Sequence, residues 1–139
     1  MQRLILAILA VSMAGASVVR ADDAMLIPKG ARVYLAPMDG FETYLAAAII
    51  KKDVPVSVVA RKESAQFAIS GNSETVKSGW VKALVTGGAR ADSRGSIMVT
   101  NLRTGVVVYA YAVEDEDGGK QSIAESCAKH LKKRIEKGR

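Results

Sequence analysis

The sequence contains one cysteine and one histidine among its 139 residues, and aromatic side chains make up only 5% of it. Structural zinc sites take their ligands from several Cys and His residues, and disulfide frameworks need paired cysteines, so both are excluded. The shortage of aromatic residues predicts a core built from Val, Ile, Leu and Ala. Neither a Gly-x-Gly-x-x-Gly motif nor a P-loop occurs, so no cofactor is expected.

The few residues suited to catalysis are not arranged for it. A Ser-His-Asp triad needs its histidine beside a nucleophile, and no Gly-x-Ser-x-Gly motif is present. His130 and Cys127 both fall on a predicted helix, where we expect a partly buried ring and a buried, unreactive thiol. The acidic run 114–117 is contiguous, so its carboxylates cannot flank a substrate. That run is interpreted as a solvated turn or, alternatively, as an incomplete calcium loop. The chain is therefore expected not to be an enzyme, with no metal site.

The long uncharged run near the start indicates export. Residues 4–19 carry no charge, follow Arg3, and end in Val19-Arg20-Ala21, a pattern of small residues that a signal peptidase recognises. The sequence predicts a signal peptide over residues 1–21, cleaved after Ala21, with a cut near Ala16 as the alternative. The run is shorter than the ~20 residues of a membrane-spanning helix, so none is expected in the mature chain. Residues 22–139 are expected to form one domain, in the periplasm or outside the cell.

Hydrophobic periodicity divides the rest of the chain into strands and helices. We expect strands over 32–37, 54–60, 66–76, 95–102 and 106–114, and helices over 41–52 and 122–137. The first strand, helix and second strand predict a βαβ unit with parallel strands, and Gly105 predicts a tight hairpin. The expected fold is α+β, a single mixed sheet with two helices on one face. Residues 77–94 are expected to form a long hairpin connection.

Helix ends are also marked in the sequence. Asp39 with Glu42, and Ser122 with Glu125, have the spacing of capping boxes at the two helix starts. Gly138 is the expected stop of the second helix.

Several short motifs resemble a class of bacterial envelope domains. They are Val33-Tyr-Leu-Ala-Pro37, the Val-rich strand 54–60, Ala65-Gln-Phe-Ala-Ile-Ser-Gly71 and Thr104-Gly-Val-Val-Val108. The class includes the periplasmic domain of the curli secretion channel, the amino-terminal domain of the Tol system's β-propeller protein, and lipoprotein activators of penicillin-binding proteins. The chain also resembles small, uncharacterised exported bacterial proteins. Gln66 replaces the Asp of those families, and there is no lipobox Cys. The resemblance implies a non-enzymatic adaptor or assembly module.

Two surfaces are candidate binding sites. The formal net charge is +6, and much of the excess lies in the tail, where Lys129, Lys133 and Lys137 recur every fourth residue opposite an apolar helix stripe. This basic face either contacts anionic envelope surfaces or is simply solvated. Tyr109 and Tyr111 share one face of the last strand, which we predict to be the open, helix-free face. With Trp80 they would form a recognition surface, unless residues 77–94 cover it.

The main functional hypothesis is a non-catalytic exported binding or assembly module of the cell envelope, whose partner is an envelope protein or an anionic surface. The alternatives are a binder of anionic surfaces through the basic helix, and an enzyme or transport factor of unrecognised type. Export makes nucleic acid an unexpected partner.

Overall fold

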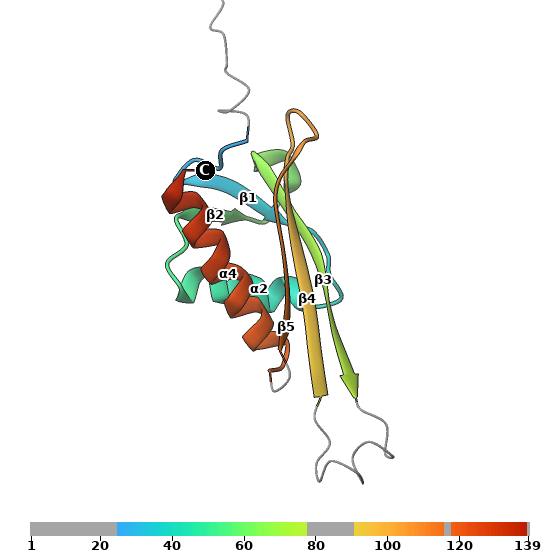
Figure 1. Cartoon of the computed structure of the whole chain (residues 1–139). Coiled ribbons are helices and arrows are strands. Elements are labelled where there is room, and N and C mark those ends of the chain that lie inside the picture. Colours follow the sequence, from blue (N-terminus) through green and yellow to red (C-terminus); the bar gives the residue numbers. More distant parts are fainter. Residues whose placement is uncertain (1–24, 78–90, 116–117, 139) are drawn as a thin grey trace, which may run out of the picture.

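The computed structural model describes residues 25–77, 91–115 and 118–138. One mixed sheet carries two helices, which is the predicted α+β class (Figure 1). The strands are β1 (Ala31–Leu35), β2 (Val56–Val59), β3 (Phe67–Lys77), β4 (Ala91–Asn101) and β5 (Val107–Asp115). The helices are α2 (Phe41–Lys51) and α4 (Lys120–Lys137), with a short 3-10 turn, η1 (Lys62–Ser64), before β3.

The strand order in the sheet is β2-β1-β3-β4-β5. β1 pairs in parallel with both β2 and β3, while β3, β4 and β5 pair antiparallel. The predicted βαβ unit and the predicted hairpin are therefore both confirmed. Gly105, with φ of 72°, turns that hairpin, and its N–H donates to the Asn101 carbonyl at 2.8 Å. The sheet ends at two edge strands, the short β2 and the long β5.

The chain turns sharply between β1 and α2. Asp39 and Gly40 both have left-handed backbones, with φ of 53° and 87°, and Gly40 is the N-cap without a side-chain bond. The predicted cap at Asp39 is therefore wrong, because its backbone is already used for the turn. Glu42 does reach back as expected: its carboxylate accepts the N–H groups of Met38 (2.8 Å) and Gly40 (3.1 Å). Hydrogen bonds from backbone N–H groups lower the pKa of Glu42.

The start of α4 also differs from the prediction. The helix begins at Lys120 with Gly119 as N-cap, so Ser122 lies inside the first turn rather than at its boundary. Glu125 pairs instead with the ammonium groups of Lys51 (2.7 Å) and Lys52 (3.3 Å) at the end of α2. The predicted stop is confirmed, because Gly138 is the C-cap with φ of 61°. A side chain suited to capping was thus used to join the two helices.

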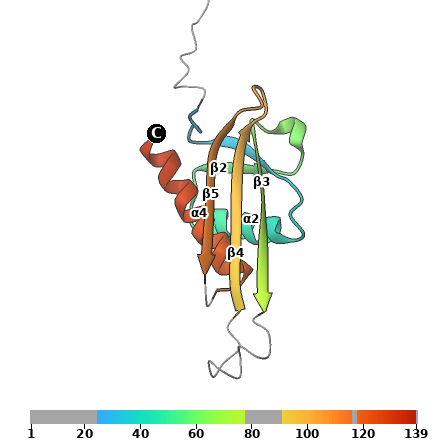
Figure 2. The same cartoon turned by 45° about the vertical axis from the view of Figure 1, so that its right-hand side comes forward.

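Both helices lie on the same side of the sheet, as expected (Figures 1 and 2). Between them and the strands lies one core of aliphatic residues with two phenylalanines, in which Cys127 is fully buried as predicted. The approach of α4 to the sheet is close at Gly95, where an added Cβ would collide with the Ile123 side chain. The missing side chain at residue 95 is what lets the first turns of α4 rest on β4.

The predicted faces of β5 are inverted. Tyr109 and Tyr111 pair with Val99 and Ile97, which are fully buried beneath the helices, so the tyrosines lie on the helix side. Both pack against the core, and the exposed Ala110 and Ala112 lie on the open face instead. The close approach of α4 to the sheet is made possible by Gly95 of β4 instead. The tyrosines fill the margin between the edge strand and α4.

Some predictions concern residues outside the described ranges. The signal peptide with its cleavage after Ala21 is one, and Trp80 is another. Residues 116–117 of the acidic run also lie outside. The predicted connection 77–94 is too long, because Lys77 belongs to β3 and residues 91–94 belong to β4.

Candidate functional site

The outer surface of α4 carries cations that the protein leaves unpaired. Lys129, Lys133 and Lys137 are all exposed, and within the described part of the chain none makes a hydrogen bond or ion pair. Their neighbours differ: Lys132 donates to the Lys52 carbonyl at 2.9 Å, and Arg134 to the Met25 carbonyl at 3.4 Å. The three lysines spaced four residues apart are therefore the ones whose ammonium groups remain available to a ligand.

An aromatic pair lies on the flank of α4 that meets β5. The rings of Tyr111 and His130 stack with their centroids 4.2 Å apart and an interplanar angle of 16°. The Tyr111 hydroxyl lies 3.3 Å from the Ser126 hydroxyl, one helical turn before His130. Partial burial and the charges of Lys133 and Lys129 lower the pKa of His130. The shift favours the neutral form of the ring, and the stack presents a flat surface beside the lysines.

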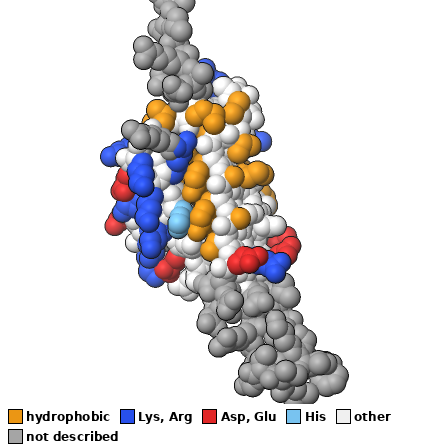
Figure 3. Space-filling view, viewed as in Figure 1, with side chains coloured by type: hydrophobic (Ala, Val, Ile, Leu, Met, Phe, Trp, Pro, Cys, Tyr) orange, Lys and Arg blue, Asp and Glu red, His pale blue; other side chains and the backbone are white. Residues whose placement is uncertain are grey.

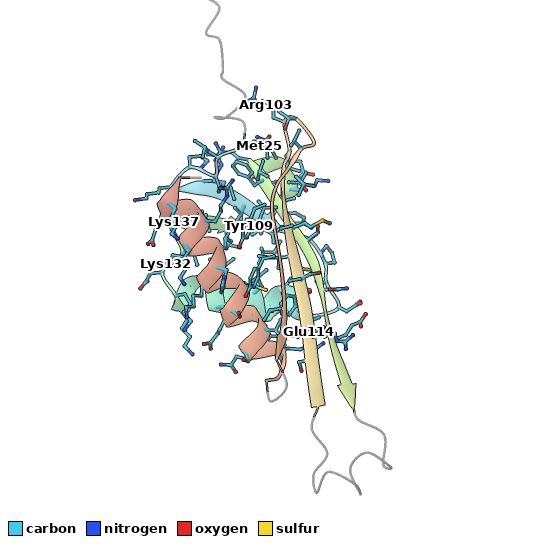
Figure 4. All side chains as sticks on the ribbon, viewed as in Figure 1. Met25, Arg103, Tyr109, Glu114, Lys132 and Lys137 are labelled. Atoms are coloured by element: carbon cyan, nitrogen blue, oxygen red, sulfur yellow. The ribbon has the colours of Figure 1, made fainter. Side chains whose placement is uncertain are left out.

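Tyr109 completes this aromatic row one step along β5, between β5 and α4 (Figure 4). Burial raises the pKa of its hydroxyl, with smaller contributions from Tyr111 and Cys127. The Cys127 thiol lies deeper, and burial raises its pKa to about 11. A thiol with that pKa is protonated at neutral pH, so Cys127 is unsuited to act as a nucleophile.

The edge of β5 adds exposed apolar groups to the same side of the molecule. Residues 106–113 contain no charged side chain, and Val106 and Val107 are 43% and 44% exposed. No other strand of the described ranges pairs with the outer edge of β5. Natural edge strands of this length usually carry a charge or a proline that prevents further pairing. Apart from a register shift between Val99 and Thr100, β5 lacks such protection until Glu114.

These features form one surface, which we call the α4–β5 face: Lys129, His130, Lys133 and Lys137 of α4 with Tyr109, Tyr111 and the outer edge of β5. In Figure 3 a column of cationic side chains follows α4, a column of apolar side chains follows β5, and the histidine lies between them. The lysines and the tyrosines were predicted to lie on opposite sides of the molecule. The structure places both sets on this one face. Their role in binding stays a prediction. His130 and the β5 edge were not predicted as part of a site.

Nowhere in the described ranges do three side chains of His, Cys, Asp or Glu gather closely enough to hold a metal ion. Neither described helix is long and apolar enough to cross a membrane. The α4–β5 face combines exposed cations, a stacked pair of rings and a strand edge that no other described strand pairs with.

Comparison with known proteins shows the fold but no family. No protein-family model and no curated protein matches the chain. Among solved structures, the PelC dodecamer from Paraburkholderia phytofirmans is similar, with a TM-score of 0.55, 15% identity, and coverage of 76% of this chain and 89% of that one. TolB from Acinetobacter baumannii is similar with a TM-score of 0.50 and 4% identity, covering 74% of this chain but only 28% of TolB. The likeness to TolB agrees, at the level of the fold, with the expected resemblance to the Tol propeller protein.

Proposed function

We propose that this protein is a non-catalytic, exported module of the bacterial cell envelope that binds through the α4–β5 face. The signal-peptide pattern of residues 1–21 and the shared fold with PelC and TolB support the envelope assignment. The observation that carries the binding role is the row Lys129, Lys133 and Lys137, which is exposed, lies beside half-buried tyrosines and has no partner among the described residues.

The ligand that fits this face is an anionic envelope surface. Each lysine near an anionic bilayer contributes about 1 kcal/mol, and tyrosine rings favour the boundary between water and apolar groups. The three lysines reach outward from a helix whose apolar side is held in the core, so they can engage a surface without any change of fold. The attraction is electrostatic and should fade as salt shortens the Debye length.

The test is co-sedimentation with vesicles of anionic or zwitterionic lipid, at salt concentrations of about 0.01 M and about 1 M, where the Debye length is about 30 Å and 3 Å. We expect binding only to anionic vesicles at low salt. The triple variant Lys129→Gln, Lys133→Gln, Lys137→Gln should lose it. The matched control Lys29→Gln, Arg61→Gln, Arg94→Gln removes equal charge elsewhere and should keep it. Absence of wild-type binding at low salt would contradict the proposal, as would equal loss in both triple variants.

A second candidate function is assembly through the β5 edge. The uncharged, unpaired edge of this strand favours pairing with a further strand, and PelC, which shares the fold, is a dodecamer in its structure. An oligomer seen by native mass spectrometry that dissociates in Ala110→Lys, which places a charge on that edge strand, would support assembly. A monomeric wild type across the concentrations used would exclude it.

A further inference from the structure

A groove of about 780 Å³ lies near one end of the sheet, away from the α4–β5 face. It is formed by the segment before β1, the turn η1, the start of β3 and the β4–β5 loop. Figure 4 shows Arg103 on that loop, at the opposite end of the sheet from Glu114. Pockets of about 300–1,000 Å³ are the usual size for small-molecule ligands.

The lining of the groove has an apolar part. Leu26 and Pro28 of the segment before β1 and Leu102 of the β4–β5 loop are accessible apolar residues of this lining. Phe67 borders the groove from the core, and because it is only 4% exposed it offers little surface to a ligand. Leu102 is positioned by its backbone N–H, which donates to the Gln66 carbonyl at 3.0 Å. An apolar group of a ligand would find a preformed surface here.

The polar part of the lining offers mainly donors. The Gln66 side-chain carbonyl accepts the Arg32 N–H at 3.0 Å, and that of Asn101 accepts the N–H groups of Arg103 (2.9 Å) and Thr104 (3.3 Å). These bonds assign the orientation of both amides, so each NH₂ group is left over. Within the described ranges neither NH₂ group has a protein partner.

Two cations add to these donors. The Lys62 ammonium and the Arg103 guanidinium both line the groove, and neither makes an ion pair or hydrogen bond among the described residues. Glu63 is the one carboxylate in the lining, and it is exposed. The lining thus has two cations and two amide NH₂ groups that lack partners among the described residues, against one carboxylate. This balance favours an anionic ligand.

We propose that this groove binds a single-chain anionic amphiphile as a monomer, with its chain against Leu26, Pro28 and Leu102 and its carboxylate or phosphate at Lys62 and Arg103. The apolar lining contacts the chain of the ligand, and the donors without partners among the described residues bind its anionic group. This site is separate from the α4–β5 face and does not depend on the function proposed for that face.

The test uses dodecanoate below its micelle concentration, followed by isothermal titration calorimetry. We expect binding of one dodecanoate per chain, with acetate and the uncharged dodecyl maltoside each at least about tenfold weaker, because each lacks one of the two contacts. Lys62→Gln and Arg103→Gln should each weaken binding about tenfold, which is the effect of losing a charge-assisted hydrogen bond. Leu102→Ser should also weaken it.

Two controls localise the binding. Arg61→Gln removes a neighbouring exposed cation that does not line the groove and should leave the affinity unchanged. The α4 triple variant should bind dodecanoate as well as the wild type does, which separates this site from the α4–β5 face. The proposal is overturned if dodecanoate does not bind, if acetate binds equally well, or if the Lys62 and Arg103 variants keep full affinity while remaining folded by circular dichroism.

Discussion

The two faces of the sheet differ sharply in what they carry. On the helix side of the central strands, Ile69, Ile97 and Val99 are fully buried. On the opposite side, Met98 is 46% exposed and its neighbours on β5, Ala110 and Ala112, are exposed and small. A mixed sheet with one packed and one solvated face alternates in this way along each strand. The open face therefore carries mostly small and polar side chains. The exposed lysines and the aromatic rings lie instead where β5 meets α4.

The largest difference in unfolding free energy should be between variants of two adjacent residues that lie on opposite faces of the sheet. Ile97→Ala leaves a cavity in the core and should cost about 2–5 kcal/mol of unfolding free energy. Met98→Ala, one residue along on the open face, should change it by less than about 0.5 kcal/mol. Urea unfolding of both variants measures the difference. A large cost at Met98 would mean that something covers the open face.

Gly95→Ala tests the closeness of α4 to the sheet. The added Cβ meets the Ile123 side chain, so overpacking should cost about 1–3 kcal/mol. In Gly119→Ala the added Cβ has nothing within 4 Å, so its cost should be limited to the loss of a favoured N-cap residue, below about 1 kcal/mol. Thermal unfolding compares the two. If Gly95→Ala combined with Ile123→Ala is no less stable than Ile123→Ala alone, the clash is the cause; equal costs for Gly95→Ala and Gly119→Ala would contradict the close approach.

The buried thiol provides a third measure of the packed face. Cys127→Ser places a hydroxyl in an apolar site and should cost about 1–3 kcal/mol. In the wild type, burial and the pKa raised to about 11 should make the native thiol react slowly with a thiol reagent at pH 8, and denaturant should make it react fully. Rapid labelling of the native protein would show that α4 opens readily.

The smallest expected effect on stability concerns the ion pairs that Glu125 of α4 makes at the end of α2. Hydrogen bonds from Lys51, Gln121 and Lys52 lower the pKa of Glu125 to about 2, from 4.5 for the free group. Because the folded pKa lies below the unfolded one, this contribution is present above about pH 4.5 and is lost as the pH falls toward 2. Urea midpoints at pH 6 and pH 2.5 should differ less in Glu125→Gln than in the wild type. An unchanged pH dependence in the variant would show that these exposed pairs add nothing to stability.

Much of the fold followed from local patterns. The hydrophobic periodicity of residues 41–52 predicted α2, and Gly105 predicted the turn between β4 and β5, because each depends on spacing or backbone conformation within a few residues. The helix starts were harder to predict. Asp39 and Ser122 both fit the capping-box pattern in the sequence, yet the N-caps in the structure are Gly40 and Gly119. Which side chain caps depends on where the chain turns and on what lies across from it. Glu125, for example, meets the end of α2 instead.

The candidate site could be predicted only in pieces. The lysines of α4 and the tyrosines of β5 were each visible as a periodic set, but β5 is apolar on both faces, so alternation alone cannot say which face meets the helices. His130 gave no signal of its own, because its stacking on Tyr111 joins residues from different elements.

The sequence by itself determined the class of fold, the parallel unit, the hairpin, the basic face of the last helix and the burial of Cys127. Each of these rests on periodicity or on a glycine or proline whose effect is local. The tertiary structure alone decided that the tyrosines and the lysines share one surface. Gly95 lets α4 lie close to β4, and Tyr109 and Tyr111 pack against the core on the same side of the sheet. That choice depends on the distance between elements far apart in the chain, a quantity that no local pattern encodes.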